Sequence, residues 1–171
     1  MGTLRHLVIV LGDQLDADAL ALADFDPLQD ALWMAEVEEE STHIPSGKQR
    51  TALFLSAMRH FAEAQRALGR HVLYTKLDDA GNTGTLAGEL QRSIVMRQPQ
   101  KLVLTAPGDW RVLKALQAVA RENDVPLALK DDTHFITTVR EFAAHAKGRK
   151  QLRLEYFYRE VRRKTGLLMQ G

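Results

Sequence analysis

Residues 4–11, LRHLVIVL, form a mainly aliphatic run that is continuously apolar from Leu7 to Leu11 and stops at Gly12-Asp13. Its β-branched and aliphatic residues are typical of a strand buried on both faces, because a half-solvated strand alternates polar and apolar positions. Strands of this kind belong to parallel sheets that helices cover on both sides. We therefore interpret the run as the central first strand of such a sheet.

Four further apolar runs alternate with helix-length segments. Strands are expected at residues 31–37, 71–75, 101–105 and 127–129, and helices at residues 48–68, 83–97 and 110–122. In the first helix Leu53, Ala57, Phe61, Ala64 and Leu68 recur at the spacing of an amphipathic helix, and Gly69 follows as a stop. The alternation, with a helix between each pair of strands, predicts a doubly wound α/β fold. We expect a mostly parallel five-stranded sheet with helices on both faces, Rossmann-like or flavodoxin-like.

The pattern changes after residue 129. Residues 138–147 and 152–164 are two polar, basic helical stretches, and residues 140–171 carry nine Lys and Arg against three Glu. Such a segment suits a solvated helix face, an interdomain surface or contact with nucleic-acid phosphates. We expect an α/β domain at residues 1–137 and, at residues 138–171, a basic helical segment leading to a further domain. The apolar residues Leu167-Leu168-Met169 would need the cover of that domain.

Several classes of protein are disfavoured by what the sequence lacks. There is no cysteine, so disulfides, thiol catalysis and cysteine-held metal clusters are excluded within the chain. The six histidines are scattered and form no HExxH motif, and no GxSxG motif is present, so no metal site or hydrolytic site is predicted. No apolar run approaches the length of a bilayer span and no cleavage site follows the first one, so we expect a cytoplasmic protein without membrane contact.

Candidate ligand contacts follow the strands. Ligands of open α/β sheets bind beyond the carboxyl ends of the strands, where neighbouring crossovers go to opposite faces. Gly12 there permits close approach of a ligand, and Asp13, next to Gln14, offers a carboxylate that accepts hydrogen bonds; a turn with a helix cap is the alternative. Pro107 and Gly108 follow the fourth strand at the same edge, and Asp109 is the expected cap of the next helix.

Acidic residues follow the second strand. Glu36 lies inside an apolar run, and a carboxylate there needs a partner or a ligand because unpaired burial is costly. The run 38–40, which includes Glu40, is expected to be solvated loop with at most one residue facing a site. Lys48 opens the next helix, where free N–H groups favour an anionic or carbonyl-bearing ligand, although simple solvation is the commoner explanation. The glycines of residues 81–88 lack the spacing of a dinucleotide-binding fingerprint.

Four segments together resemble the photolyase-related family, the bacterial iron–sulfur branch of the cryptochrome/photolyase superfamily. They are LVIVLGDQL at 7–15, FLSAMRHFA at 54–62, PGDWRV at 107–112, and the block 148–169 with its GRKQLRLEYFYRE and RRKTGLLM stretches. The resemblance covers essentially the whole chain. It implies an N-terminal α/β domain that binds an antenna chromophore, a 6,7-dimethyl-8-ribityllumazine, and passes excitation energy to a flavin.

The resemblance also implies which residues and partners serve that role. Residues Gly12, Asp13, Gln14, Glu36 and Glu40 would form the chromophore pocket, with Lys48 nearby, Phe54 shaping a wall, and Pro107 and Gly108 closing the crevice. FAD, the 4Fe–4S cluster and the lesion site would belong to a C-terminal helical domain, the main partner, through which the parent meets damaged DNA. Tyr156, Phe157 and Tyr158 would pack between domains.

Three functions therefore stay open. The leading one is antenna binding for a light-dependent DNA repair enzyme that reverses pyrimidine photoproducts, of the (6-4) type, or for a cryptochrome-type photoreceptor. In either case the chain alone is expected to be catalytically inactive. The alternatives are a stand-alone nucleotide- or flavin-binding module that uses the same sheet edge, and a ligand-free scaffold that supports the helical domain.

Overall fold

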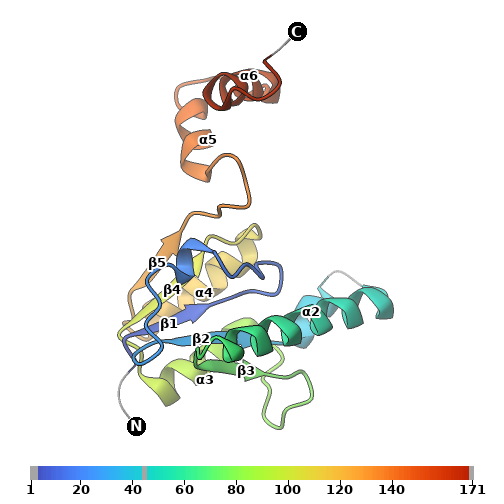
Figure 1. Cartoon of the computed structure of the whole chain (residues 1–171), viewed down its shortest axis with the longest axis vertical. Helices are drawn as coiled ribbons and strands as arrows, with labels where there is room; N and C mark the ends of the chain where they lie inside the picture. Colours follow the sequence, from blue (N-terminus) through green and yellow to red (C-terminus); the bar gives the residue numbers. More distant parts are fainter. Residues whose placement is uncertain (1–3, 44–45, 170–171) are drawn as a thin grey trace. The chain divides into compact units, whose positions relative to one another are not determined.

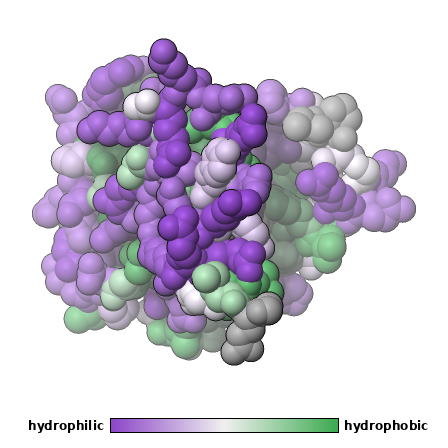
Figure 2. Space-filling view, turned by 90° about the horizontal axis from the view of Figure 1, so that it is seen from above, coloured by the Kyte–Doolittle hydropathy of each residue, from purple (hydrophilic) through white to green (hydrophobic). Residues whose placement is uncertain are grey.

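The computed structural model describes residues 4–43 and 46–169, which form two compact units (Figure 1). The first unit ends at Lys130 and the second begins at Asp131. The functional domain boundary that the sequence places after residue 137 stays a prediction. Hydrophilic side chains make up most of the surface in Figure 2, with apolar ones in separate patches.

The first unit is built on a five-stranded sheet in which all neighbouring strands are parallel. The strands are β1 (His6–Ile9), β2 (Ala31–Ala35), β3 (Val72–Thr75), β4 (Lys101–Thr105) and β5 (Leu127–Lys130). Their order is β3-β2-β1-β4-β5, so the first strand is central, with Leu7 paired to both Ala31 and Leu102. The predicted doubly wound α/β class is confirmed, and the strand order is the Rossmann one rather than the flavodoxin one.

Two apolar layers bury the faces of the sheet. Helices α3 (Leu86–Arg97) and α4 (Trp110–Glu122) cover one face, where Leu90 and Leu116 are fully buried against the strands. Helix α2 (Lys48–Ala67) and the 3₁₀ turn η1 (Leu20–Leu22) cover the other. The chain thus changes face between the crossovers that follow β1 and β4. The ends of β1 and β4 are the switch point of the sheet.

The connection from β1 to β2 differs from the helix that the alternation predicts. It is irregular apart from η1, because its aspartates bond the backbone locally. Asp16 accepts a hydrogen bond from the backbone N–H of Asp18, and Asp26 accepts one from Leu28. Short acidic side chains that satisfy nearby N–H groups in this way compete with helix formation.

Helix α2 buries a different face from the one marked by its apolar stripe. Leu53 and Leu68 are 73% and 66% exposed, whereas Met58, Ala62 and Gln65 are buried. Polar contacts accompany this rotation, because Arg59 pairs with the buried Glu36 directly after β2 and Gln65 bonds Arg70. The predicted stop is confirmed, since Gly69 has a left-handed φ of 78°.

The second unit is a pair of short helices, α5 (Val139–Ala146) and α6 (Leu154–Thr165). Phe157 packs edge-on against Phe142 with ring centroids 5.1 Å apart, and His145 Nδ1 lies 2.8 Å from the Glu160 carboxylate. A capping box at Thr138 starts α5. Within the ranges described, no helix combines the length and apolar character needed to cross a bilayer.

Candidate functional site

A cavity of about 260 Å³ lies beyond the carboxyl ends of β1, β2 and β4, in the first unit. This is the sheet edge at which the sequence predicts a ligand. The predicted site residues that line it are Gly12, Asp13, Glu36, Glu40, Phe54 and Pro107, whereas Gln14, Lys48 and Gly108 do not. The sequence therefore predicts the position of the cavity correctly, but three of the nine predicted residues lie outside its lining.

Apolar side chains form most of the cavity wall. Leu55 and Met58 come from α2, and Leu86 and Val112 from the first turns of α3 and α4. Polar side chains also line the cavity, among them the hydroxyls of Ser41 and Thr51. Apolar walls with a few placed polar groups are the usual composition of a small-molecule site.

Gly12 is required by the packing of α2. A Cβ atom at this position would lie 2.5 Å from Cε1 of Phe54 and 2.8 Å from Sδ of Met58. The close approach that the sequence predicts for a ligand is thus made by two side chains of the protein. Phe54 is 41% exposed, so its ring covers Gly12 while keeping one side at the cavity.

The Gln14 side chain connects the two chain segments that meet at the switch point. Its side chain is buried, and Nε2 donates to the carbonyls of Thr105 and Ala106, each at 3.2 Å. These bonds join the loop after β1 to the end of β4. Gln14 therefore supports the floor of the site from outside the cavity, where the sequence expects a direct contact.

Glu36 is fully buried and satisfied by the protein itself. Arg59 donates to its two oxygens from Nε at 2.6 Å and from Nη2 at 2.8 Å, Tyr74 donates its hydroxyl at 2.6 Å, and the Leu77 N–H donates at 2.9 Å. Four bonds fill the acceptor sites of a carboxylate. The sequence predicts that a buried Glu36 carboxylate needs either a protein partner or a ligand, and the structure shows that its partners are groups of the protein.

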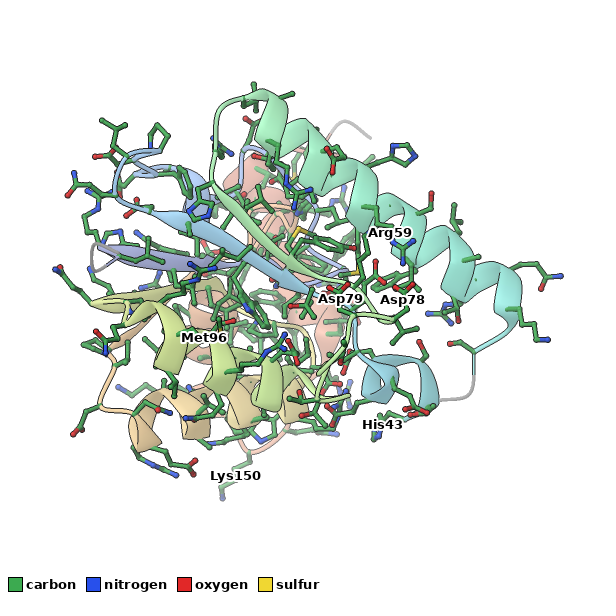
Figure 3. The ribbon with its side chains drawn as sticks, turned by 90° about the horizontal axis from the view of Figure 1, so that it is seen from below. His43, Arg59, Asp78, Asp79, Met96 and Lys150 are labelled. Carbon is green, nitrogen blue, oxygen red and sulfur yellow. The ribbon has the colours of Figure 1, made fainter. Side chains whose placement is uncertain are left out.

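The ionisation of this network follows from its geometry. Burial alone would raise the pKa of Glu36, but the bonds from Arg59, Tyr74 and Leu77 outweigh it and hold that pKa below its usual value. Burial and the bond to Glu36 raise the pKa of the Tyr74 hydroxyl, so this group stays a neutral donor. In Figure 3, Arg59 projects from α2 toward the loop after β3, which carries Asp78 and Asp79. Sequence reasoning missed Arg59 and Tyr74, since no local signal links them to Glu36.

A second ionic group joins the two sides of the switch point. The run 38–40 is the start of a short helix, α1 (Glu38–Thr42), rather than the expected loop. Arg111 on α4 binds Glu39 at 3.0 Å and Glu40 at 2.9 Å, and it also reaches Asp109 at 3.3 Å. The hydrogen bond to Glu40 raises the pKa of Arg111. Glu40 thus lines the cavity with its carboxylate already paired.

Asp109 caps α4, as the sequence predicts. Its carboxylate accepts from the Arg111 N–H at 2.7 Å, and this bond, with the nearby guanidinium, lowers the pKa of Asp109. The cap fixes the position of Pro107, which lines the cavity two residues earlier. Gly108 lies between them and contributes only backbone to the turn.

Two charges of the cavity have no partner among the residues that the structure describes. They are the Asp13 carboxylate after β1 and the Arg50 guanidinium in the first turn of α2. Lys48 lies at the start of the same helix, exposed and outside the lining. A molecule in the cavity would therefore meet one free acceptor group, from Asp13, and one free donor group, from Arg50.

The sequence of this chain is similar to those of known proteins. The family model described as "Deoxyribodipyrimidine photo-lyase-related protein" matches residues 8–171. The chain is 42% identical over 168 residues to a protein of Agrobacterium fabrum (strain C58) named "(6-4) photolyase". The match covers 98% of this chain and 33% of that relative, so the chain spans about one third of the relative's length.

Proposed function

Because this chain belongs to the deoxyribodipyrimidine photolyase-related family, we propose that it binds the antenna chromophore of a light-dependent DNA repair protein. The observation that carries the proposal is the cavity at the switch point, with apolar walls and two unpaired charges. Antenna binding needs no catalytic group, and the other charged residues of the site, Glu36, Glu40 and Asp109, are paired within the protein.

A 6,7-dimethyl-8-ribityllumazine has the chemistry that the cavity would accept. Leu55 and Met58 would contact its flat bicyclic ring, Asp13 would accept from ring N–H or ribityl hydroxyl groups, and Arg50 would donate to a ring carbonyl. When bound, this group would absorb light and pass the excitation to a flavin. The role of the chain is to hold the ring in place and keep water from it.

The size of the cavity favours such a compact ligand. Its volume is just below the range of about 300–1,000 Å³ typical of small-molecule pockets, so a bicyclic ring would fill it and a polyol chain would lie at the rim. FAD is much larger, and no cysteine is present to hold a cluster. As the family resemblance implies, we propose that FAD and a 4Fe–4S cluster belong to a C-terminal helical domain of a longer parent protein, the partner of this chain.

The parent's substrate is proposed from the relative. The name of the Agrobacterium fabrum protein supports reversal of a (6-4) pyrimidine photoproduct in damaged DNA, and a cryptochrome-type photoreceptor parent is the alternative for the same antenna site. One observation favours a ligand-free scaffold instead, since the Phe54 ring already covers Gly12 and takes part of the edge.

The test is a fluorescence titration of the purified chain with dimethyl-ribityllumazine, with FMN as the competing ligand. We expect micromolar lumazine binding that Asp13→Asn weakens by roughly tenfold, the loss of one charged hydrogen bond. Asp18→Asn, an exposed carboxylate in the same connection, is the matched control and should bind as the wild type does. Failure to bind either ligand would support the scaffold, and preference for FMN would support a flavin- or nucleotide-binding module.

A further inference from the structure

A second cavity, of about 80 Å³, lies on the face of the sheet that α2 and η1 cover. Strands β1, β4 and β5 and the connection between β1 and β2 contribute its lining. None of these residues lines the cavity at the switch point, so the two cavities are separate. Antenna binding does not use the second cavity, and its residues indicate a binding site of their own.

The floor of the second cavity is apolar. Val8 on β1, Val103 on β4 and Ala128 on β5 are neighbours in the register of the parallel strands, so their side chains point to the same face. Phe25 from the connection after β1 also lines the cavity, and the Arg70 guanidinium lies over its ring at 5.4 Å. A ligand would therefore rest on aliphatic and aromatic groups in the middle of the cavity.

A lysine lines each end of this floor. Lys101 begins β4 beside His6, its register partner on β1, whereas Lys130 ends β5 beside Thr105. Four residues of β4 separate these two levels, which is about 13 Å at roughly 3.3 Å per residue. Both lysines are half-buried, and neither forms an ion pair with another of the residues that the structure describes. An ammonium group that is partly withdrawn from water and lacks a counter-charge is stabilised by an anion.

The carboxylates of the second cavity do not neutralise these lysines. Asp30 is fully buried and accepts from Arg5 Nε at 2.8 Å and from Arg5 Nη2 at 2.5 Å. It also accepts from the backbone N–H groups of His6 and Asp26. Asp24 is the other carboxylate in the lining, and it is exposed to solvent. Two ammonium groups thus face one solvated carboxylate, and the cavity keeps a positive charge.

We propose that the second cavity binds a small aliphatic dicarboxylate, with one carboxylate at Lys101 and His6 and the other at Lys130. Lysine carries its ammonium group on a flexible four-carbon stem, so both charges can close on a ligand a few carbons long whose methylene groups cover the apolar floor. A compact oxyanion would need both stems to bend to one point and would leave that floor uncovered. A nucleotide is too large, because pockets for such ligands begin at about 300 Å³. The proposal does not depend on the antenna function.

The His6 ring provides a reporter at one end of the second cavity. Its Nδ1 lies 3.6 Å from the Asp30 carboxylate, and its side chain is 19% exposed. Burial lowers the pKa of His6 more than the nearby Asp30 raises it, and the charge of Lys101 adds to the lowering. A carboxylate bound at Lys101 would favour the protonated ring and raise this pKa. An anion bound elsewhere on the surface would leave it unchanged.

The experiment follows the His6 ring of the 171-residue chain by NMR during titration with succinate, with its signal identified by its loss in His6→Gln. Titrations with acetate and with inorganic phosphate at equal ionic strength provide the comparison. Lys130→Gln removes the charge at the far end of the cavity, and Lys130→Arg keeps it. Lys76→Gln, at an exposed position directly after β3, is the control of equal charge change. Circular dichroism verifies that each variant is folded.

We expect succinate to bind the wild type, Lys130→Arg and Lys76→Gln with millimolar affinity and to raise the pKa of His6. Lys130→Gln should weaken succinate binding roughly tenfold, the loss of one charge-assisted hydrogen bond, and acetate should bind the wild type more weakly by a similar factor. No change at His6 with succinate would overturn the proposal. Equal binding of succinate and acetate, tighter binding of phosphate, or equal affinities of Lys130→Gln and Lys76→Gln would also overturn it.

Discussion

The stability of the first unit should depend on the pair between Arg59 and Glu36. Arg59→Ala removes two of the four bonds to a carboxylate whose side chain is fully buried, and leaves Tyr74 and the Leu77 N–H as donors. Breaking a buried pair costs about 3–5 kcal/mol. Because the Arg59 side chain is 46% exposed, water replaces part of its contribution, and we expect the lower end, about 3 kcal/mol.

The effect should depend on pH in a direction that the pKa of Glu36 sets. The wild-type pKa of Glu36 is depressed, so its ionised form stabilises the fold above the unfolded value and this contribution is lost as the pH falls. In Arg59→Ala the burial remains while two bonds are lost, so that pKa rises. The difference between variant and wild type should be largest near pH 7, should shrink as the pH falls through the raised pKa of the variant, and should be lost fully only below the depressed pKa of Glu36 in the wild type.

Urea unfolding followed by circular dichroism at pH 7 and pH 4 measures both quantities. Arg66→Ala is the matched control on the same helix, because its pair with Glu63 is exposed and should contribute less than about 1 kcal/mol. A destabilisation by Arg59→Ala below that of the control, or one that is equal at the two pH values, would refute the reasoning.

Three further predictions concern the cavity and the activity. Gly12→Ala should destabilise the fold by about 1–3 kcal/mol, because its Cβ would meet the Phe54 ring and Met58, and thermal unfolding against a Gly47→Ala control, where the nearest atom is 3.8 Å away, tests this. Asp109→Ala should lower the thermal stability through the loss of the helix cap, measured in the same way, and no change would show that the cap is dispensable. The 171-residue chain should show no light-dependent repair of a (6-4) lesion in an oligonucleotide, scored by chromatography; turnover by the chain alone would disprove this.

Local patterns were enough to predict most of the elements. The apolar runs that begin at residues 4, 31, 71, 101 and 127 coincide with the five strands, and the amphipathic segment from residue 48 with α2. Such patterns reflect spacing within a few residues, which the chain carries wherever it folds. The edge of the sheet at which the cavity lies also followed, because parallel strands bring their carboxyl ends together.

The connection after β1 was predicted less well, although the signal for it was local. Asp16 and Asp26 bond N–H groups two residues further on, which a reading based on strand–helix alternation overlooks. The prediction of a solvated loop at residues 38–40 was wrong for another reason. Its carboxylates meet Arg111, about 70 residues further along the chain, and a pairing of that kind leaves no pattern in the sequence.

The sequence by itself thus determined the class of fold, its central strand and the edge that carries the cavity. Only the tertiary structure decided that Glu36 binds Arg59 and Tyr74, that Gln14 ties β1 to β4, and that α2 rests on Met58 and not on Leu53. The physical reason is that a carboxylate inside an apolar run must have a partner when it is buried, and this requirement can be read from the sequence. Which group becomes the partner depends on the distant residues that the packed sheet and helices bring within hydrogen-bonding distance.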